Sequence, residues 1–189
     1  MSDNKNISYA NSVKPFSSGF ALIKLTDSEV DRIESFARHV VMAKSKESQY
    51  RRDNSSMLKR FYTGTAGELA VEKYLNIKGI VDWSIGDSDK YYHPDLSSIG
   101  IKAGVKTVDY GLFPIVFKDS KSHELINILF NKRYVYICGV ATPNVLNKYQ
   151  SVDLIRDPKL KNKGTKSAFY GFEHLLHFKD IDELKELIK

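Results

Sequence analysis

The nine residues YVYICGVAT, at positions 134–142, constrain the fold more than any other segment. They are almost all apolar, and most are β-branched or aromatic. Such a run predicts a strand that is buried on both faces, which requires a covering layer on each side of a sheet. Cys138 lies within it, where a small buried side chain is expected. As the only cysteine, it excludes an internal disulfide or a cysteine-built zinc site and favours a reducing cytoplasm.

Helical patterns come before this run. Thr26 and Glu29 form a capping box, and apolar residues at helical spacing follow it, so a helix is predicted over about 27–46. A second helix, GELAVEKYLN, is predicted after Gly64. The polar and basic segment 46–60 between them is expected to be a loop.

Short apolar runs and turn residues follow from position 80. The predicted elements are strands at 80–85 and 112–117, a hairpin with arms 93–96 and 101–108, a helix at 123–133, a strand near 152–155 and a helix at 177–189. Together they predict an α/β fold in one domain, 1–189, with residues 1–20 as a loose N-terminal arm or a peripheral strand. No apolar run is long enough to span a bilayer, and the N-terminus lacks the pattern of a secretory signal.

The charge balance favours a polyanionic partner, but only modestly. The chain has 29 Lys and Arg against 23 Asp and Glu, a net charge of +6. Nucleic acid is the expected polyanion, although many basic proteins bind none.

Three charged residues line up in an order that suits metal-assisted hydrolysis of a phosphodiester. Glu68 lies in the first turns of its helix, Asp95 begins the predicted hairpin after Pro94, and Lys106 lies on the return arm. Asp95 and Glu68, with the carbonyl of Val105, would offer oxygen ligands to Mg²⁺, or to Mn²⁺ in its place. Lys106 would hold the attacking water or stabilise charge on the phosphorane.

This pattern resembles the PD-(D/E)XK nuclease superfamily over residues 64–142. The resemblance rests on the helix glutamate in GTAGELAVEKYL, on Pro94-Asp95, and on a lysine in the next strand that is followed by a helix and a buried strand. The tail FYGFEHLLHF is similar to the endings of phage members. The resemblance implies a restriction-endonuclease-like central mixed β-sheet flanked by helices. It also implies a Mg²⁺-dependent deoxyribonuclease in the cytoplasm, which would be the host cytoplasm if the protein is phage-encoded.

One position departs from the family pattern. The acid-X-lysine triplet is Gly104-Val105-Lys106 here, so the expected carboxylate is missing. Acids migrate to other elements in this superfamily, and Glu68, Asp109 and Asp119 are candidates to compensate, with Glu68 favoured. The alternative is a catalytically inactive module on the same fold that binds DNA or another protein.

Basic clusters would supply the contacts to DNA. They are Arg51, Arg52, Lys59, Arg60, Lys161, Lys163 and Lys166, with KLKNKGTK (159–166) as a flexible DNA-contacting loop and Tyr50, Phe61 and Tyr62 as residues for base stacking. Each cluster alone is also typical of a solvated face, and each site residue has an ordinary structural alternative. The form of the DNA, its sequence and a homodimeric state are left open.

Overall fold

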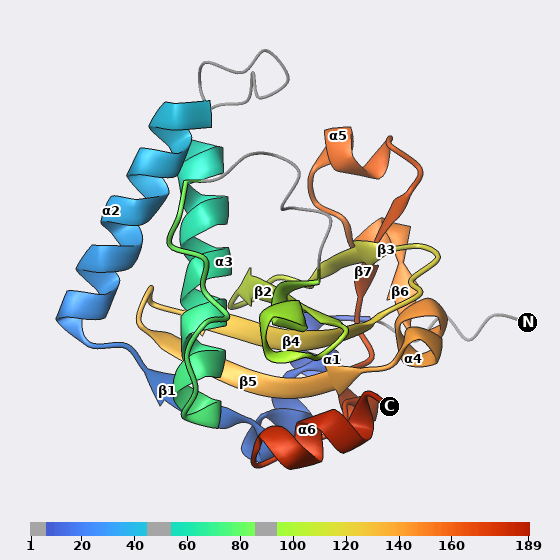
Figure 1. Ribbon diagram of the computed structural model, residues 1–189. Coiled ribbons are helices and arrows are strands. Elements are labelled where there is room, and N and C mark those ends of the chain that lie inside the picture. The colour runs from blue at the N-terminus through green and yellow to red at the C-terminus, as the bar shows by residue number, and fades with distance from the viewer. Residues whose placement is uncertain (1–6, 45–53, 86–93) are drawn as a thin grey trace, which may run out of the picture.

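The computed structural model describes residues 7–44, 54–85 and 94–189 (Figure 1). The helices are α1 (Tyr9–Ser12), α2 (Asp27–Lys44), α3 (Asn54–Leu75), α4 (Pro143–Lys148), α5 (Pro158–Lys161) and α6 (Ile181–Leu187), with short 3₁₀ turns η1 (Lys14–Gly19), η4 (Asp95–Ile99), η5 (Val152–Leu154) and η6 (Phe172–His174). The strands are β1 (Ala21–Lys24), β2 (Ala103–Asp109), β3 (Ile115–Phe117), β4 (His123–Phe130), β5 (Tyr134–Ala141), β6 (Gln150–Ser151) and β7 (Lys166–Phe169). In these ranges no helix has the length and apolar character needed to cross a bilayer.

Four strands form a mixed sheet in the order β1-β5-β4-β2. β2 runs parallel to β4, whereas β1 and β4 each run antiparallel to β5. β5 lies inside the sheet, and Val135, Ile137 and Val140 on it are almost inaccessible to solvent. The prediction of a strand buried on both faces at 134–142 is therefore confirmed, together with an α/β architecture in which helices flank a mixed sheet.

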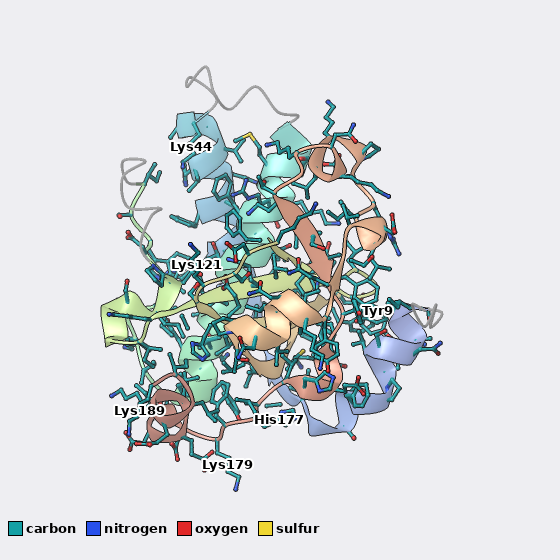
Figure 2. All side chains as sticks on the ribbon, turned by 90° about the vertical axis from the view of Figure 1, so that its right-hand side faces the viewer. Tyr9, Lys44, Lys121, His177, Lys179 and Lys189 are labelled. Atoms are coloured by element: carbon teal, nitrogen blue, oxygen red, sulfur yellow. The ribbon has the colours of Figure 1, made fainter. Side chains whose placement is uncertain are left out.

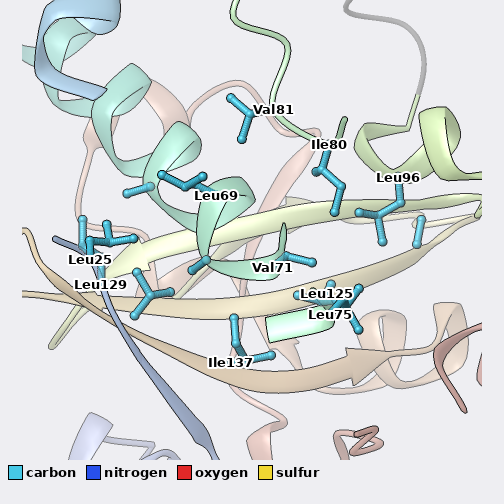
Figure 3. Close-up of a cluster of buried hydrophobic side chains, with 14 of the residues drawn as sticks. Leu25, Leu69, Val71, Leu75, Ile80, Val81, Leu96, Leu125, Leu129 and Ile137 are labelled. Carbon is cyan, nitrogen blue, oxygen red and sulfur yellow. The ribbon is translucent and has the colours of Figure 1, made fainter. Parts of the chain in front are cut away.

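The helices α2 and α3 lie side by side over one face of this sheet (Figure 1). The predicted capping box begins α2: the Thr26 backbone N–H donates to Glu29 Oε2 at 2.7 Å, and the Glu29 N–H donates to Thr26 Oγ1 at 3.2 Å. Side chains of α3 then pack against the sheet in a large apolar core (Figure 3), which includes Leu69, Val71, Leu75, Leu125, Leu129 and Ile137.

A glycine sets how closely α3 approaches β2. A Cβ on Gly67 would lie 1.7 Å from Thr107 Oγ1, so any side chain at this helix position would collide with the strand. The close approach fixes the lateral position of α3, which carries Glu68 beside this contact.

A second sheet of three strands, in the order β3-β7-β6, helps to cover the other face. Its apolar side chains pack with those of the first sheet in a second core, which includes Val116, Ile126, Ile128, Cys138, Leu146, Phe169 and Phe172. The buried position of Cys138 agrees with its sequence assignment. Pro114 lies just before β3 and has no backbone N–H to donate, so the sequence predicts that this strand is not central. β3 is indeed an edge strand.

Residues 7–20 are not the loose arm that the sequence suggests. They form α1 and η1 and pack against the second core, where Val13 is 2% exposed and Tyr9, Phe16 and Phe20 are partly buried. Figure 2 labels Tyr9, the first residue of α1. Apolar residues spaced through a polar segment supply the packing energy that keeps it in place. Residues 1–6 lie outside the described ranges.

The prediction of a helix at 123–133 is wrong, because this segment forms the strand β4. Leu125, Ile126, Ile128 and Leu129 are buried, and alternate residues contact the two opposite cores. An apolar run that is buried on both faces matches a helix and an internal strand equally well on spacing alone. Here the neighbouring strands β2 and β5 satisfy its backbone groups.

The prediction of a polar loop at 46–60 is wrong for residues 54–60, because α3 already begins at Asn54. Met57 and Tyr62 are buried in the helical segment before Gly64, and Leu58 and Phe61 are partly buried against the core. Their spacing extends the apolar face of α3 towards its N-terminus, whereas the polar residues between them suggested a loop. The part of the prediction that falls on 46–53 lies outside the described residues.

The strand predicted at 80–85 is an irregular segment. The backbone N–H groups of Gly79, Ile80 and Val81 all donate to Glu72 Oε1, at 2.8, 2.8 and 3.0 Å. This buried carboxylate supplies the acceptor that a neighbouring strand would otherwise provide, so the segment needs no strand pairing.

Two further predicted strands are 3₁₀ turns. The first arm of the expected hairpin is η4, which ends at Gly100 with a φ of +77°, and the strand predicted near 152–155 is η5. The return arm, β2, is confirmed, but it pairs with β4 rather than with residues 93–96 in the described part of the chain. The strand predicted at 112–117 and the C-terminal helix are present as β3 and α6.

Candidate active site

The parallel pairing of β2 with β4 brings a glutamate next to Gly104. Gly104 is in register with Glu124, the second residue of β4. A Cβ built on Gly104 would lie 2.2 Å from Glu124 Oε2, 3.1 Å from Glu124 Cδ and 3.4 Å from Asp95 Oδ2. The carboxylate of Glu124 therefore occupies the space that a side chain at position 104 would fill.

Asp95 reaches the same place from η4. Pro94 precedes it with a φ of −58°, and Asp95 Oδ2 accepts a hydrogen bond of 2.6 Å from the backbone N–H of Val105. Because the N–H of Val105 donates to Asp95 on η4, it points to the free edge of β2, away from β4. The N–H and C=O of one strand residue point to the same side, which places the Val105 carbonyl on the edge that Asp95 faces.

Lys106 completes the group on β2. Its Nζ lies 3.5 Å from Glu124 Oε2, an ion-pair distance. Within the described residues Oε2 is buried and has no hydrogen-bond partner. Burial raises the pKa of Glu124, the Asp95 carboxylate adds to the rise, and Lys106 opposes it. A buried carboxylate oxygen without a hydrogen-bond donor is what a bound cation or an ordered water would satisfy.

Glu68 faces this group from α3. Burial raises its pKa to about 8, and the charges of Asp95 and Glu72 add to the rise, while Lys106 opposes it. Glu68 therefore interacts electrostatically with Asp95 and Lys106. No three His, Cys, Asp or Glu side chains gather into a metal-binding group anywhere in the described ranges. Direct metal ligation by Glu68 therefore stays a prediction.

The other two acids proposed to compensate for Gly104 have different surroundings. Asp109, at the far end of β2, forms an ion pair of 2.6 Å with Lys59 and lies 3.4 Å from Thr63 Oγ1. Asp119 is exposed in the turn after β3. Sequence reasoning missed Glu124 because it placed that residue on a helix, where no strand register could bring it to Gly104.

Lys166, the first residue of β7, approaches the group from the second sheet. Its pKa is lowered to about 8, mainly by burial and then by the positive charge of Lys106, whereas Glu124 opposes the shift. Arg60 and Lys163 contribute to the same repulsion. The predicted DNA-binding residues at 60, 163 and 166 therefore act in one electrostatic field with the candidate site.

The remaining basic residues are less suited to bind phosphate. Lys59 is neutralised by Asp109, and Lys161 forms an ion pair of 3.0 Å with Asp153. Residues 159–161 belong to α5 rather than to a continuous flexible loop. Arg51 and Arg52 lie outside the described residues.

Base stacking on Tyr62, as suggested by the sequence, does not fit the structure. Tyr62 is 7% exposed, and its hydroxyl donates to the backbone carbonyl of Lys132 at 2.7 Å. Phe61 is partly buried in the first core, and Tyr50 lies outside the described ranges. The aromatic residues beside the first basic clusters are therefore core residues where the structure describes them.

Comparisons with protein-family models, with curated proteins and with solved structures find no significant match to this chain. Interpretation of the site consequently rests on its own geometry.

Proposed function

We propose that this protein is a Mg²⁺-dependent deoxyribonuclease with a restriction-endonuclease-like arrangement of its sheet and helices. One observation carries the proposal: the Glu124 carboxylate fills the space of the acidic side chain that is absent at Gly104. A carboxylate from the neighbouring strand thus completes the set of Asp95, an acid and Lys106 that the resemblance to PD-(D/E)XK nucleases requires.

The groups present fit a hard divalent cation. Asp95 and Glu124 supply two carboxylates beside the edge carbonyl of Val105, and Mg²⁺ is commonly held by one or two carboxylates plus substrate phosphate and water. Glu124 Oε2, which is buried and has an ion pair with Lys106 but no hydrogen bond within the described residues, supports a cation at this point. Mg²⁺, or Mn²⁺ in its place, would supply the charge that polarises the phosphate and lowers the pKa of a bound water.

The chain's own residues would then act on the substrate directly. The Lys106 ammonium, held near Glu124 on a rigid strand, would donate hydrogen bonds to the attacking water and to the phosphate oxygens as negative charge develops there. Glu68 would sit at the inner wall of the site. Arg60, Lys163 and Lys166 would attract the DNA backbone. The one cysteine, buried and free, suits the reducing cytoplasm in which we place the protein.

A cleavage assay tests the proposal. Supercoiled plasmid and single-stranded circles would be incubated with Mg²⁺, Mn²⁺ or EDTA and with the wild type or the variants Asp95→Asn, Lys106→Ala and Glu124→Gln. We expect metal-dependent cleavage that each substitution lowers by about 10²–10³-fold. Lys185→Ala, on the distant helix α6, is the matched control and should cleave like the wild type.

A carboxylate exchange gives a sharper test of the key observation. Glu124→Ala should be inactive, and Gly104→Asp combined with Glu124→Ala should recover part of the activity, because the carboxylate returns to the same space from β2. Cleavage that survives Asp95→Asn, Lys106→Ala and Glu124→Gln would overturn the proposal. Salt-sensitive DNA binding without any cleavage would instead favour the inactive DNA-binding module.

A further inference from the structure

Phe117, on the edge strand β3, is an exposed aromatic residue that contacts a lysine of the second sheet. Its side chain is 52% exposed, and it pairs in register with Lys166 on β7. Lys166 Nζ lies over the Phe117 ring, 2.9 Å from its centroid. Burial and then Lys106 lower the pKa of Lys166 and Glu124 opposes that shift, so the Phe117–Lys166 pair lies within electrostatic reach of the candidate site.

The charges around this pair are unbalanced. Lys166 is repelled by Lys106, Arg60 and Lys163, and Glu124 is the one attractive charge among the groups that shift its pKa. Lys106 and Lys166 are partly buried whereas Arg60 and Lys163 are exposed, and a polyanion would relieve the repulsion among these four like charges. The Lys166 ammonium rests on the ring face, a weaker interaction than a charge-assisted hydrogen bond to a phosphate.

We infer that Phe117 and Lys166 bind the nucleotide beside the cleaved phosphate, with the ring stacking on an unpaired base and the ammonium contacting a phosphate. The inference rests on the proposed function and specifies its substrate as DNA that has unpaired bases at the cut. Lys166 moves from the ring to the phosphate, and the freed ring face receives the base. Bases within a duplex already stack on their neighbours on both sides, so only an unpaired base offers a free face to the ring.

Binding and cleavage would be measured on one labelled oligonucleotide, either single-stranded or annealed to its complement. Fluorescence anisotropy in EDTA reports binding without cleavage, and Mg²⁺ starts the reaction for kcat and KM. The variants are Phe117→Leu, which keeps an apolar side chain without a ring, Phe117→Trp, which keeps a ring, and Lys166→Ala. Phe130→Leu removes another exposed ring, at the opposite end of β4 from Glu124, and is the matched control.

We expect Phe117→Leu to weaken single-strand binding about tenfold and to raise KM more than it lowers kcat, with little effect on duplex binding. Phe117→Trp should restore single-strand binding, Lys166→Ala should weaken binding of both forms, and Phe130→Leu should match the wild type. Thermal melts establish that each variant is folded. Equal binding by Phe117→Leu and wild type, or an equal loss for both DNA forms, would overturn the inference.

The same experiment separates failure of this inference from failure of the proposed function. Ring-dependent binding of single strands without any cleavage would retain the stacking contact but reject hydrolysis, and with it the place of that contact beside a cleaved phosphate. Metal-dependent cleavage that is the same for Phe117→Leu and wild type would retain hydrolysis and reject the stacking contact.

Discussion

Replacing Gly104 with alanine is expected to disable the candidate site while leaving the fold almost unchanged. The new Cβ would lie 2.2 Å from Glu124 Oε2, whereas ordinary contacts begin at 3.4 Å. The oxygen must therefore retreat by about 1.2 Å. It is the end of a flexible side chain, so rotation of Glu124 absorbs the collision without moving the backbone.

The structure sets the size of both effects. A misplacement of about 1 Å in a catalytic group costs about 100-fold in rate, which corresponds to about 2.7 kcal/mol of lost transition-state stabilisation. The free energy of unfolding should change by less than about 1 kcal/mol, because a lower entropy of the unfolded chain offsets the rotation of Glu124.

The assay is kcat/KM for cleavage with Mg²⁺, paired with urea unfolding of the same samples. Gly64→Ala is the matched control, because a Cβ on Gly64 in α3 meets no atom within 4 Å. It should keep wild-type cleavage and gain about 0.5–1 kcal/mol of stability. A folded Gly104→Ala variant that cleaves as fast as the wild type would refute the assignment of Glu124.

Three further predictions concern α3. The pKa of Glu68 rises from its usual 4.5 to about 8 in the folded protein. Between these two pH values the folded protein holds a proton that the unfolded chain releases. The contribution of protonated Glu68 to the free energy of unfolding is therefore full below pH 4.5 and is lost as the pH rises to about 8. Urea unfolding at pH 5 and pH 8 should show a smaller loss for Glu68→Gln than for wild type. Glu72→Ala should lose at least about 2 kcal/mol in the same assay, since three backbone N–H groups lose their acceptor, and Glu72→Gln should lose less. Gly67→Ala should lower stability by about 1–3 kcal/mol through its collision with Thr107. A melting temperature as high as that of Gly64→Ala would contradict this.

The parts of the fold that follow local rules were predictable from the sequence. The capping box at Thr26 and Glu29 identifies the start of α2, and the apolar run at 134–142 identifies the internal strand β5. Both signals depend on residues that are close in the chain. Asp95 and Lys106 were also found from local order, and the structure places them near each other and near Glu68.

The parts that depend on distant pairing were not predictable in the same way. Leu125, Ile126, Ile128 and Leu129 satisfy helical spacing as well as they satisfy a strand buried on both faces. The β-branched isoleucines and the tight turn at Asn131-Lys132, where both φ angles are positive, were the signals that favoured a strand. Without the strand there was no register, and without the register Glu124 could not be recognised as the missing acid.

The parallel register of β2 and β4 also determines when the candidate site can form. Parallel neighbours cannot be joined by a tight turn, and here residues 110–122 make the crossover. That crossover contains β3, which pairs with β7 of the second sheet. Closing such a long connection is slow and gains no contact energy until both ends are paired. We therefore expect the approach of Lys106 to Glu124 to come late in folding, and recovery of activity after dilution from denaturant would report when β2 and β4 have paired.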